Sequence, residues 1–185
     1  MLTVMSLGWG VQSWTLAAMS ALDDLPLVDF AIHANTTWEH QATYQFAAQW
    51  TPWLGEHGVK VVTVSDAHQA ARVTTETTDI PAFTLSEEDG IHGQLRRQCT
   101  SRWKIQPIRR FITQELRRRG LAKRPGIVEQ WIGISLDEVE RVKDSDVKYI
   151  TNRFPLLDKL MGRADCATWL NKHGLPIPPK SACVF

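Results

Sequence analysis

The sequence predicts an α/β protein whose β-sheet is mainly parallel. Short apolar runs alternate with longer segments of helical pattern, and glycine or polar residues bound each run. A strand–helix–strand–helix–strand order implies parallel strands joined by right-handed crossovers. A glycine-containing loop also joins the first expected strand to the first expected helix. Since parallel sheets bind ligands beyond the carboxyl ends of their strands, this loop is the first candidate for a site.

The amino-terminal third supplies three strands and two helices. The strands are expected at 2–7, 28–33 and 60–64. The first helix is expected at 13–22, with Ser13 at or near its N-cap. A second helix is expected at 41–57, ending at Gly58, because glycine tolerates the left-handed backbone that follows many helices.

Less regular segments follow. A basic helix is expected at 101–119, ending at Gly120, and a further buried strand at 127–134. The preceding stretch, 74–98, is polar and has no periodicity, so it is interpreted as a lid or substrate loop, with a tolerated insertion as the alternative. Short helices and proline turns are expected over 136–185.

Composition narrows the class of protein. Residues 1–185 suit a single domain with its own core. A net charge of +1 argues against a nucleic-acid footprint over the whole surface, while allowing a local patch. No apolar stretch is long enough to span a membrane, and the first residues do not resemble a signal peptide. Three cysteines do not indicate a disulfide framework, so a cytoplasmic enzyme with reduced thiols is expected.

The loop after the first strand is suited to phosphate. Helix N-termini carry unpaired N–H groups, and glycine lets the backbone approach an anion. A Walker A loop would need a lysine where this chain has Gln12, and a dinucleotide fingerprint would need glycine at Ser13 and an acid near Asn35. A tight turn without a ligand is the alternative. The nucleotide-binding candidates of the loop are Ser6, Leu7, Gly8, Trp9, Gly10, Val11, Gln12 and Ser13.

A third loop pattern, S-G-G-x-D-S, matches at Gly10 and Ser13, with Trp9 and Gln12 in place of a glycine and the aspartate. Four further segments follow this loop along the chain, in an order that one group of proteins shares. They are H-A-N-T-T-W-E at 33–39, R-Q-C-T-S-R-W-K-I-Q-P at 97–107, G-I-S-L-D-E-V-E-R at 133–141, and the closing region from 152 to 183.

Together these segments resemble the phosphoadenosine phosphosulfate (PAPS) reductase-like family of the PP-loop ATP pyrophosphatase, or adenine nucleotide alpha-hydrolase, superfamily. Its members occur in bacteria and phages, some in CRISPR-associated settings, and their loop often reads S-x-G-x-G-V-Q-S. The resemblance implies a three-layer α/β/α fold with a mainly parallel, Rossmann-like (HUP-type) sheet. It also implies cleavage of ATP between its α and β phosphates, with Mg²⁺, to activate an unknown acceptor.

The resemblance extends to residues outside the loop. The end of the second strand, with His33 and Asn35, is expected to meet adenine and ribose, although Asn35 stands where the family usually has aspartate. Arg97 and Lys104 are expected phosphate ligands, with a solvated helix face as the alternative, and Gly133 is expected near the nucleotide. The expected catalytic residues are Lys104, Asp137, Glu138 and Arg141, with helix N-capping as the alternative for Asp137.

Cysteine chemistry separates this chain from a PAPS reductase. The E-C-G-[IL]-H tail that carries the nucleophilic cysteine is absent from the sequence, so sulfonucleotide reduction itself is not expected. Cys99, Cys166 and Cys183 are candidate ligands of an iron–sulfur cluster or zinc, with three unrelated buried thiols as the alternative.

Two further functions stay open. The first is a non-catalytic nucleotide-binding module with a protein partner, which the departures at Gln12 and Asn35 favour. The second is a sulfur-transfer enzyme acting on nucleic acid or a sulfonucleotide. For this function the basic helix from Arg102 to Lys123 would contact phosphates, with a solvated helix face as the alternative.

Overall fold

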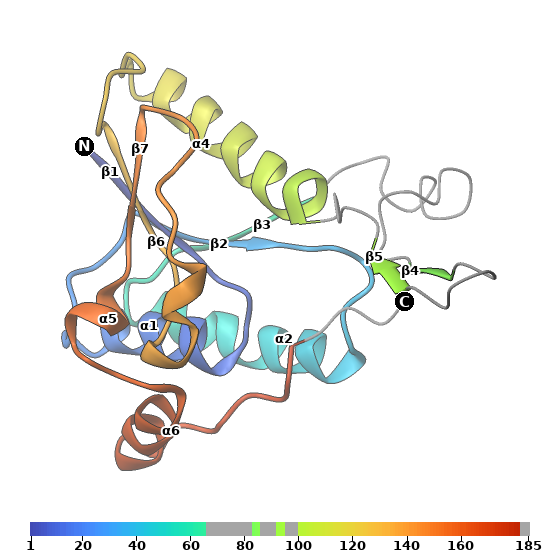
Figure 1. The fold of residues 1–185 in the computed structure, drawn as a ribbon. Helices are drawn as coiled ribbons and strands as arrows, with labels where there is room; N and C mark the ends of the chain where they lie inside the picture. Colours follow the sequence, from blue (N-terminus) through green and yellow to red (C-terminus); the bar gives the residue numbers. More distant parts are fainter. Residues whose placement is uncertain (66–82, 86–91, 95–99, 182–185) are drawn as a thin grey trace.

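A parallel β-sheet forms the centre of the molecule, as the sequence predicts. The computed structural model describes residues 1–65, 83–85, 92–94 and 100–181. Five strands lie in the order β3-β2-β1-β6-β7, and every neighbouring pair is parallel (Figure 1). These strands are β1 (Leu2–Ser6), β2 (Phe30–Ala34), β3 (Val61–Val64), β6 (Val128–Trp131) and β7 (Ile150–Arg153).

The strand order creates a switch point beside β1. From β1 the chain winds outward to β2 and β3, and it then returns to the other side of β1 with β6 and β7. The loops that leave β1 and β6 are therefore neighbours at the carboxyl edge of the sheet. Such a position is the usual ligand crevice of open parallel sheets.

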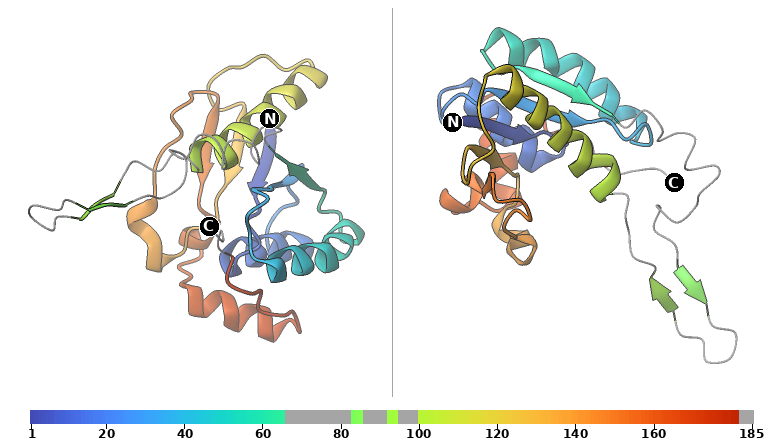
Figure 2. Two further views of the ribbon diagram at one scale, coloured as in Figure 1. Left: turned by 90° about the vertical axis from the view of Figure 1, so that its right-hand side faces the viewer. Right: turned by 90° about the horizontal axis from the view of Figure 1, so that it is seen from above.

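Helices cover both faces of the sheet, which confirms the three-layer α/β/α class. Figures 1 and 2 show α4 (Gln106–Arg118) on one face and the other helices on the opposite face. These other helices are α1 (Val11–Ala21), α2 (Gln41–Glu56), α5 (Pro155–Asp158) and α6 (Arg163–Lys172).

Alternation along the strands builds two hydrophobic cores. On β1, Leu2 and Val4 pack in a cluster with Ile112 of α4, whereas Met5 belongs to the cluster around α1. Successive side chains of a strand point to opposite faces, so one short strand serves both cores.

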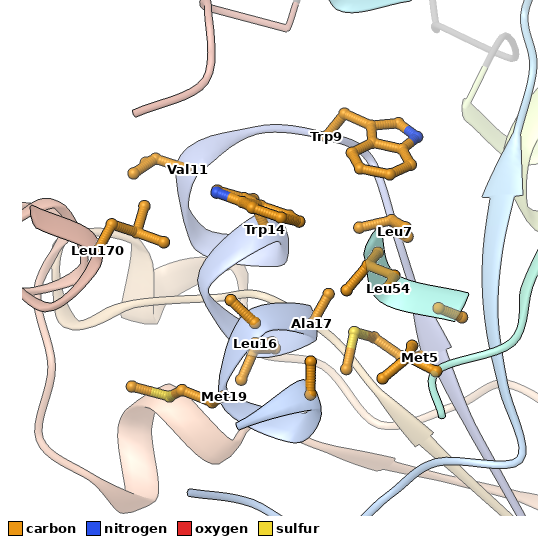
Figure 3. Packing of buried hydrophobic residues seen from close by; sticks show 14 of the residues in the cluster. Met5, Leu7, Trp9, Val11, Trp14, Leu16, Ala17, Met19, Leu54 and Leu170 are labelled. Atoms are coloured by element: carbon orange, nitrogen blue, oxygen red, sulfur yellow. The ribbon is translucent and has the colours of Figure 1, made fainter. Parts of the chain in front are cut away.

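Helix α1 is almost completely enclosed. Every one of its residues except Ser13 is buried, and α1 contacts α2, α5 and α6. Figure 3 shows Trp14 and Leu16 of α1 among the side chains of the surrounding elements. A helix that is apolar on all sides belongs in a protein interior. Its N-terminus is therefore held in a fixed position at the switch point.

The start of α1 corrects one prediction. The helix begins at Val11 and its N-cap is Gly10, not Ser13. The Ser13 hydroxyl lies inside the first turn, where it accepts a hydrogen bond from Gly8 N at 3.2 Å and donates one to Gly10 O at 3.2 Å. It closes the loop instead of capping the helix.

Other element boundaries agree more closely with the sequence predictions. Gly58 and Gly120 follow helices with φ of +83° and +65°, as expected of glycine in that position. The expected basic helix divides into a π-helical turn, Thr100–Ile105, followed by α4. Strand β7 was missed, because it is a four-residue edge strand with only Ile150 buried.

The expected lid loop lies largely outside the described residues. Within it, β4 (Phe83–Leu85) and β5 (His92–Gln94) form a separate two-stranded antiparallel sheet. Across 1–65 and 100–181, none of the helices combines the length and the apolar content needed to pass through a bilayer.

A buried carboxylate on α4 ties the helix to neighbouring charges. Glu115 accepts hydrogen bonds from Arg118 Nη2 at 2.6 Å and from Arg119 Nε at 2.8 Å, and Arg119 also pairs with Asp29 at 2.8 Å. The hydrogen bonds from Arg118, opposed by burial and helped by Arg119, lower the pKa of Glu115 to about 2. A depressed carboxyl pKa stabilises the fold above the unfolded-state value, and this contribution is lost as pH falls through the folded-state value.

We expect Glu115→Gln to destabilise the protein at pH 7, by an amount that shrinks as pH falls from about 4.5 towards about 2. Protonated Glu115 loses its ionic hydrogen bonds much as glutamine does. Denaturant unfolding at a series of pH values measures the difference. The exposed Glu140, changed to Gln, is the control and should show no such convergence. A difference between Glu115→Gln and wild type that is constant with pH would contradict the assignment.

Candidate functional site

The β1–α1 loop places the N-terminus of α1 at the switch point. Gly10 has the extended backbone of an N-cap residue, with φ −82° and ψ 167°, and as a glycine it has no side chain of its own to cap the helix. The first N–H groups of a helix have no partners within it, so they face the loop together with the positive end of the helix dipole. This is the geometry that binds anions.

Trp9 has a glycine-like backbone. Its φ is 56°, in the left-handed region that a non-glycine residue occupies at a cost of about 1–2 kcal/mol. Its indole is buried and stacks on Trp14, with ring centroids 6.1 Å apart, and meets Phe46 edge-on at 6.2 Å (Figure 3). Aromatic packing therefore offsets the backbone cost, while the indole Nε1 is buried without a hydrogen-bond partner among the described residues.

The chain leaving β6 passes directly against the first turn of α1. A Cβ at Gly133 would lie 2.9 Å from Ser13 N and 3.1 Å from the carbonyl carbon of Gln12. Both are backbone atoms that cannot rotate away, so only glycine fits. The β1 and β6 loops thus meet at the switch point, and the structure brings Gly133 next to the loop.

Gln12 connects the loop to the acidic segment after β6. Its Nε2 donates to Ser135 Oγ at 3.5 Å and to Glu138 Oε2 at 3.4 Å. An aspartate at this position would repel Glu138, whereas an amide donates to it. The departure from the wider loop pattern is therefore matched by a partner 126 residues away.

Asp137 caps a helix other than the one the sequence indicated. It lies in a 3₁₀ turn, Leu136–Arg141, and its Oδ2 accepts hydrogen bonds from Arg163 N, at the start of α6, and from Ser135 Oγ. The bond from the Arg163 backbone is the main cause that lowers the pKa of Asp137, with burial opposing it. Glu138 Oε1 pairs with Arg141 at 2.7 Å. Both carboxylates lie on the β6 side of the loop.

A charge pair with a buried carboxylate lies on the β2 side. Lys104 Nζ is 3.3 Å from Glu39 Oε1, and the Glu39 side chain is only 2% exposed. The second carboxylate oxygen, Oε2, is buried and has no hydrogen-bond partner within the part of the chain the structure describes. Sequence reasoning gave no role to Glu39, although it occupies the acidic position of the D-T-x-x-E resemblance.

His33 is held as a neutral imidazole. Its Nδ1 donates to Leu7 O at 3.2 Å, which leaves Nε2 as an acceptor. Burial is the main cause that lowers the pKa of His33, with Lys104 acting the same way and Glu39 opposing it. A neutral ring with a free acceptor suits an N–H donor of a ligand.

The remaining strand-end candidates have internal partners. Asn35 Oδ1 accepts from Thr37 N at 2.8 Å and from Tyr44 Oη at 3.1 Å, so only its amino group is left for a ligand. Ser6 Oγ accepts from Gln130 Nε2 at 2.8 Å. The Leu7 side chain is buried in the core.

The carboxyl-terminal segment lies over the loop. Trp14 Nε1 donates to Pro176 O at 3.1 Å, and Leu175 is buried. Farther along, the Ser181 hydroxyl lies 3.0 Å from the position of a Cβ on Gly10. Glycine at position 10 therefore leaves room for the chain that crosses the loop.

Three candidates fall outside the described residues, namely Arg97, Cys99 and Cys183. Cys166 is buried on α6, and burial raises the pKa of its thiol to about 11. Since Cys99 and Cys183 lie outside the described residues, an iron–sulfur cluster or zinc bound by the three cysteines stays a prediction of the sequence. No group of three metal-binding side chains occurs among the described residues.

Solved structures of other proteins have a similar fold. The chain is similar in fold to a phosphoadenylyl-sulfate (PAPS) reductase. That protein, from Candida auris, was solved as a phosphate complex; the TM-score is 0.59 at 12% sequence identity, and the match covers 95% of this chain and 74% of that chain. At this identity the likeness establishes a PAPS reductase-like fold and nothing finer. No protein-family model and no curated protein matches the chain.

Because Gly133 lies against backbone atoms, we expect Gly133→Ala to destabilise the protein by about 1–3 kcal/mol. The matched control is Gly55→Ala in α2, where nothing lies within 4 Å of the added Cβ. That change should be neutral or stabilise by up to about 1 kcal/mol, since alanine favours helix more than glycine does. Denaturant unfolding of both variants measures the contrast, and equal stability of the two would refute the close approach at Gly133.

Proposed function

We propose that this chain binds ATP at the β1–α1 loop and cleaves it between the α and β phosphates. The observation that carries the proposal is the N-terminus of α1, which begins after Gly10 at the switch point, with the Gly133 backbone against its first turn. Main-chain N–H groups of the loop would hold the triphosphate oxygens. The PAPS reductase-like fold supports this placement, as does the loop pattern.

The β2 side is suited to the nucleoside. His33 offers Nε2 as an acceptor and Asn35 offers its amino group, both at or just beyond the carboxyl end of β2. Adenine presents an exocyclic amino group and ring nitrogens, and ribose presents hydroxyls. These groups complement the two side chains without requiring the negative charge that aspartate would bring at position 35.

Positive charge on both sides of the loop would assist the chemistry. An acceptor oxygen attacks the α phosphorus, the bond from this phosphorus to the bridging oxygen breaks, and pyrophosphate leaves with that oxygen and its electron pair. Lys104 and Arg141 would stabilise the negative charge that develops on the leaving group. The acceptor is a carboxylate, a base carbonyl or water.

Two carboxylates fit a magnesium role. Mg²⁺ is commonly bound by one or two carboxylates together with substrate phosphates, and it would supply neutralisation of phosphate charge. Glu138 accepts from Gln12 at the loop, and Asp137 accepts from Ser135, which Gln12 also contacts. Glu138 would exchange its contact with Arg141 for the metal and thereby release the guanidinium for phosphate.

A non-catalytic nucleotide-binding module is the second candidate. The internal hydrogen bonds of Gln12, Asn35 and Asp137 favour it, because these side chains are already committed to neighbouring protein groups. A phage, mobile-element or CRISPR-type setting stays a prediction of the sequence resemblance. So does sulfur transfer, whose cysteines 99 and 183 lie outside the described residues.

The products distinguish these functions. With ATP labelled at the α phosphate, Mg²⁺ and the intact chain, we expect labelled AMP or an adenylylated acceptor, together with pyrophosphate. Thin-layer chromatography separates AMP from ADP. Labelled ADP would reject attack at the α phosphorus. Tight ATP binding without any product would replace the enzyme by the binding module.

A pair of variants separates ligand binding from structural support. Lys104→Met leaves the buried Glu39 carboxylate unpaired, so we expect a loss of about 1–3 kcal/mol in stability and at least about tenfold weaker ATP binding. Adding Glu39→Gln removes the buried charge and should restore stability but not affinity. Thermal unfolding and calorimetry measure the two effects. Recovery of affinity in the double variant would show that Lys104 does not contact the nucleotide.

A further inference from the structure

Positive charge is concentrated in one short segment. Residues 100–124 contain nine lysines and arginines and one acidic residue, a net charge of +8, whereas the whole chain carries only +1. Most of this segment is α4, which is the only helix described on its face of the sheet (Figures 1 and 2). The asymmetry gives one face of the molecule a strong positive potential.

One side of α4 presents a continuous polar surface. The inner side packs Ile108, Ile112 and Leu116 into the core. Around a hollow of about 440 Å³ on the helix, residues recur at the three- and four-residue spacing of a single helix face. We call this surface the arginine stripe; it consists of Gln106, Arg109, Arg110, Thr113, Gln114 and Arg117.

The residue types of the stripe match a phosphodiester backbone. All six side chains carry hydrogen-bond donors, three are arginines, and none is acidic or apolar. Arginine, glutamine and threonine are among the side chains that contact nucleic-acid phosphates and sugars. The stripe lacks the large apolar anchors of a helix that lies in a membrane interface. It also lacks the aromatic platforms on which single strands stack.

Acidic side chains near α4 form ion pairs with some of its arginines. Arg109 pairs with Asp146, whose side chain is 75% exposed. Arg118 and Arg119, outside the stripe, are held by Glu115. Arg117 is exposed, and none of the ion pairs found among the described residues involves it. A phosphate therefore finds one available guanidinium and a second whose partner is a solvent-exposed carboxylate.

We propose that the arginine stripe binds the phosphodiester backbone of a double-stranded nucleic acid. Helix α4 starts directly after the turn that holds Lys104, so a duplex on the stripe is brought beside the carboxyl edge of the sheet. Binding is independent of ATP, and it is therefore separable from the proposed cleavage. Asp146 acts as a competitor for Arg109 that a phosphate displaces.

The test uses the full chain without nucleotide. Fluorescence anisotropy measures binding of a labelled 20-base-pair RNA duplex, the DNA duplex of the same sequence, and one single strand, at increasing salt. Arg117→Gln should weaken duplex binding by about threefold to tenfold and reduce the salt slope by about 1. Asp146→Asn should strengthen binding, because it frees Arg109.

Lys172→Gln is the matched control. It removes the same charge from an exposed residue of α6, on the opposite face of the sheet, and should leave duplex binding unchanged. Binding of RNA, DNA or both duplexes with this pattern supports the proposal and identifies the nucleic acid. Absence of duplex binding, tighter binding of the single strand, or equal losses in Arg117→Gln and Lys172→Gln would overturn it. Binding to phosphatidylserine vesicles in place of duplexes would also overturn it and indicate a membrane surface.

Discussion

The contact between the Gly133 backbone and the first turn of α1 is the constraint on which the site depends. It fixes two loops from opposite sides of the sheet at one point, with no side chain between them. Helix α1 cannot move away from this contact, because it is buried between the sheet and the helices around it. The N–H groups at its start are thus preorganised, and preorganised dipoles stabilise charge without having to reorient when it develops.

The side chains around this point form two groups of opposite character. On the β6 side, carboxylates of Asp137 and Glu138 are held by backbone, amide and guanidinium donors. On the β2 side, Lys104 is held by the buried Glu39 next to a neutral histidine. A triphosphate between the groups would meet a metal-binding side and a cationic side. In the proposed function, this division would let one loop serve both nucleotide binding and charge stabilisation.

The two faces of the sheet differ in how much of the protein core they carry. The α1 face carries the larger core, in which tryptophans support the loop from beneath. The α4 face needs only one stripe of apolar residues for its core, so the outer side of that helix is free to carry charge. One strand can serve a large core on one face and a smaller core beneath a charged helix on the other, because its side chains point alternately to the two faces.

Sequence by itself determined the α/β class, the first three strands and the glycine turns at 58 and 120, because these follow from local periodicity and backbone freedom. It also singled out the loop after β1 as a candidate phosphate site, which stays a prediction. Only the tertiary structure decided that α1 starts at Val11, that Glu39 pairs with Lys104 across 65 positions and that Asp137 caps α6. These features depend on groups that meet only after the chain has folded, and strand β7 was missed because an edge strand buries too little to leave an apolar pattern.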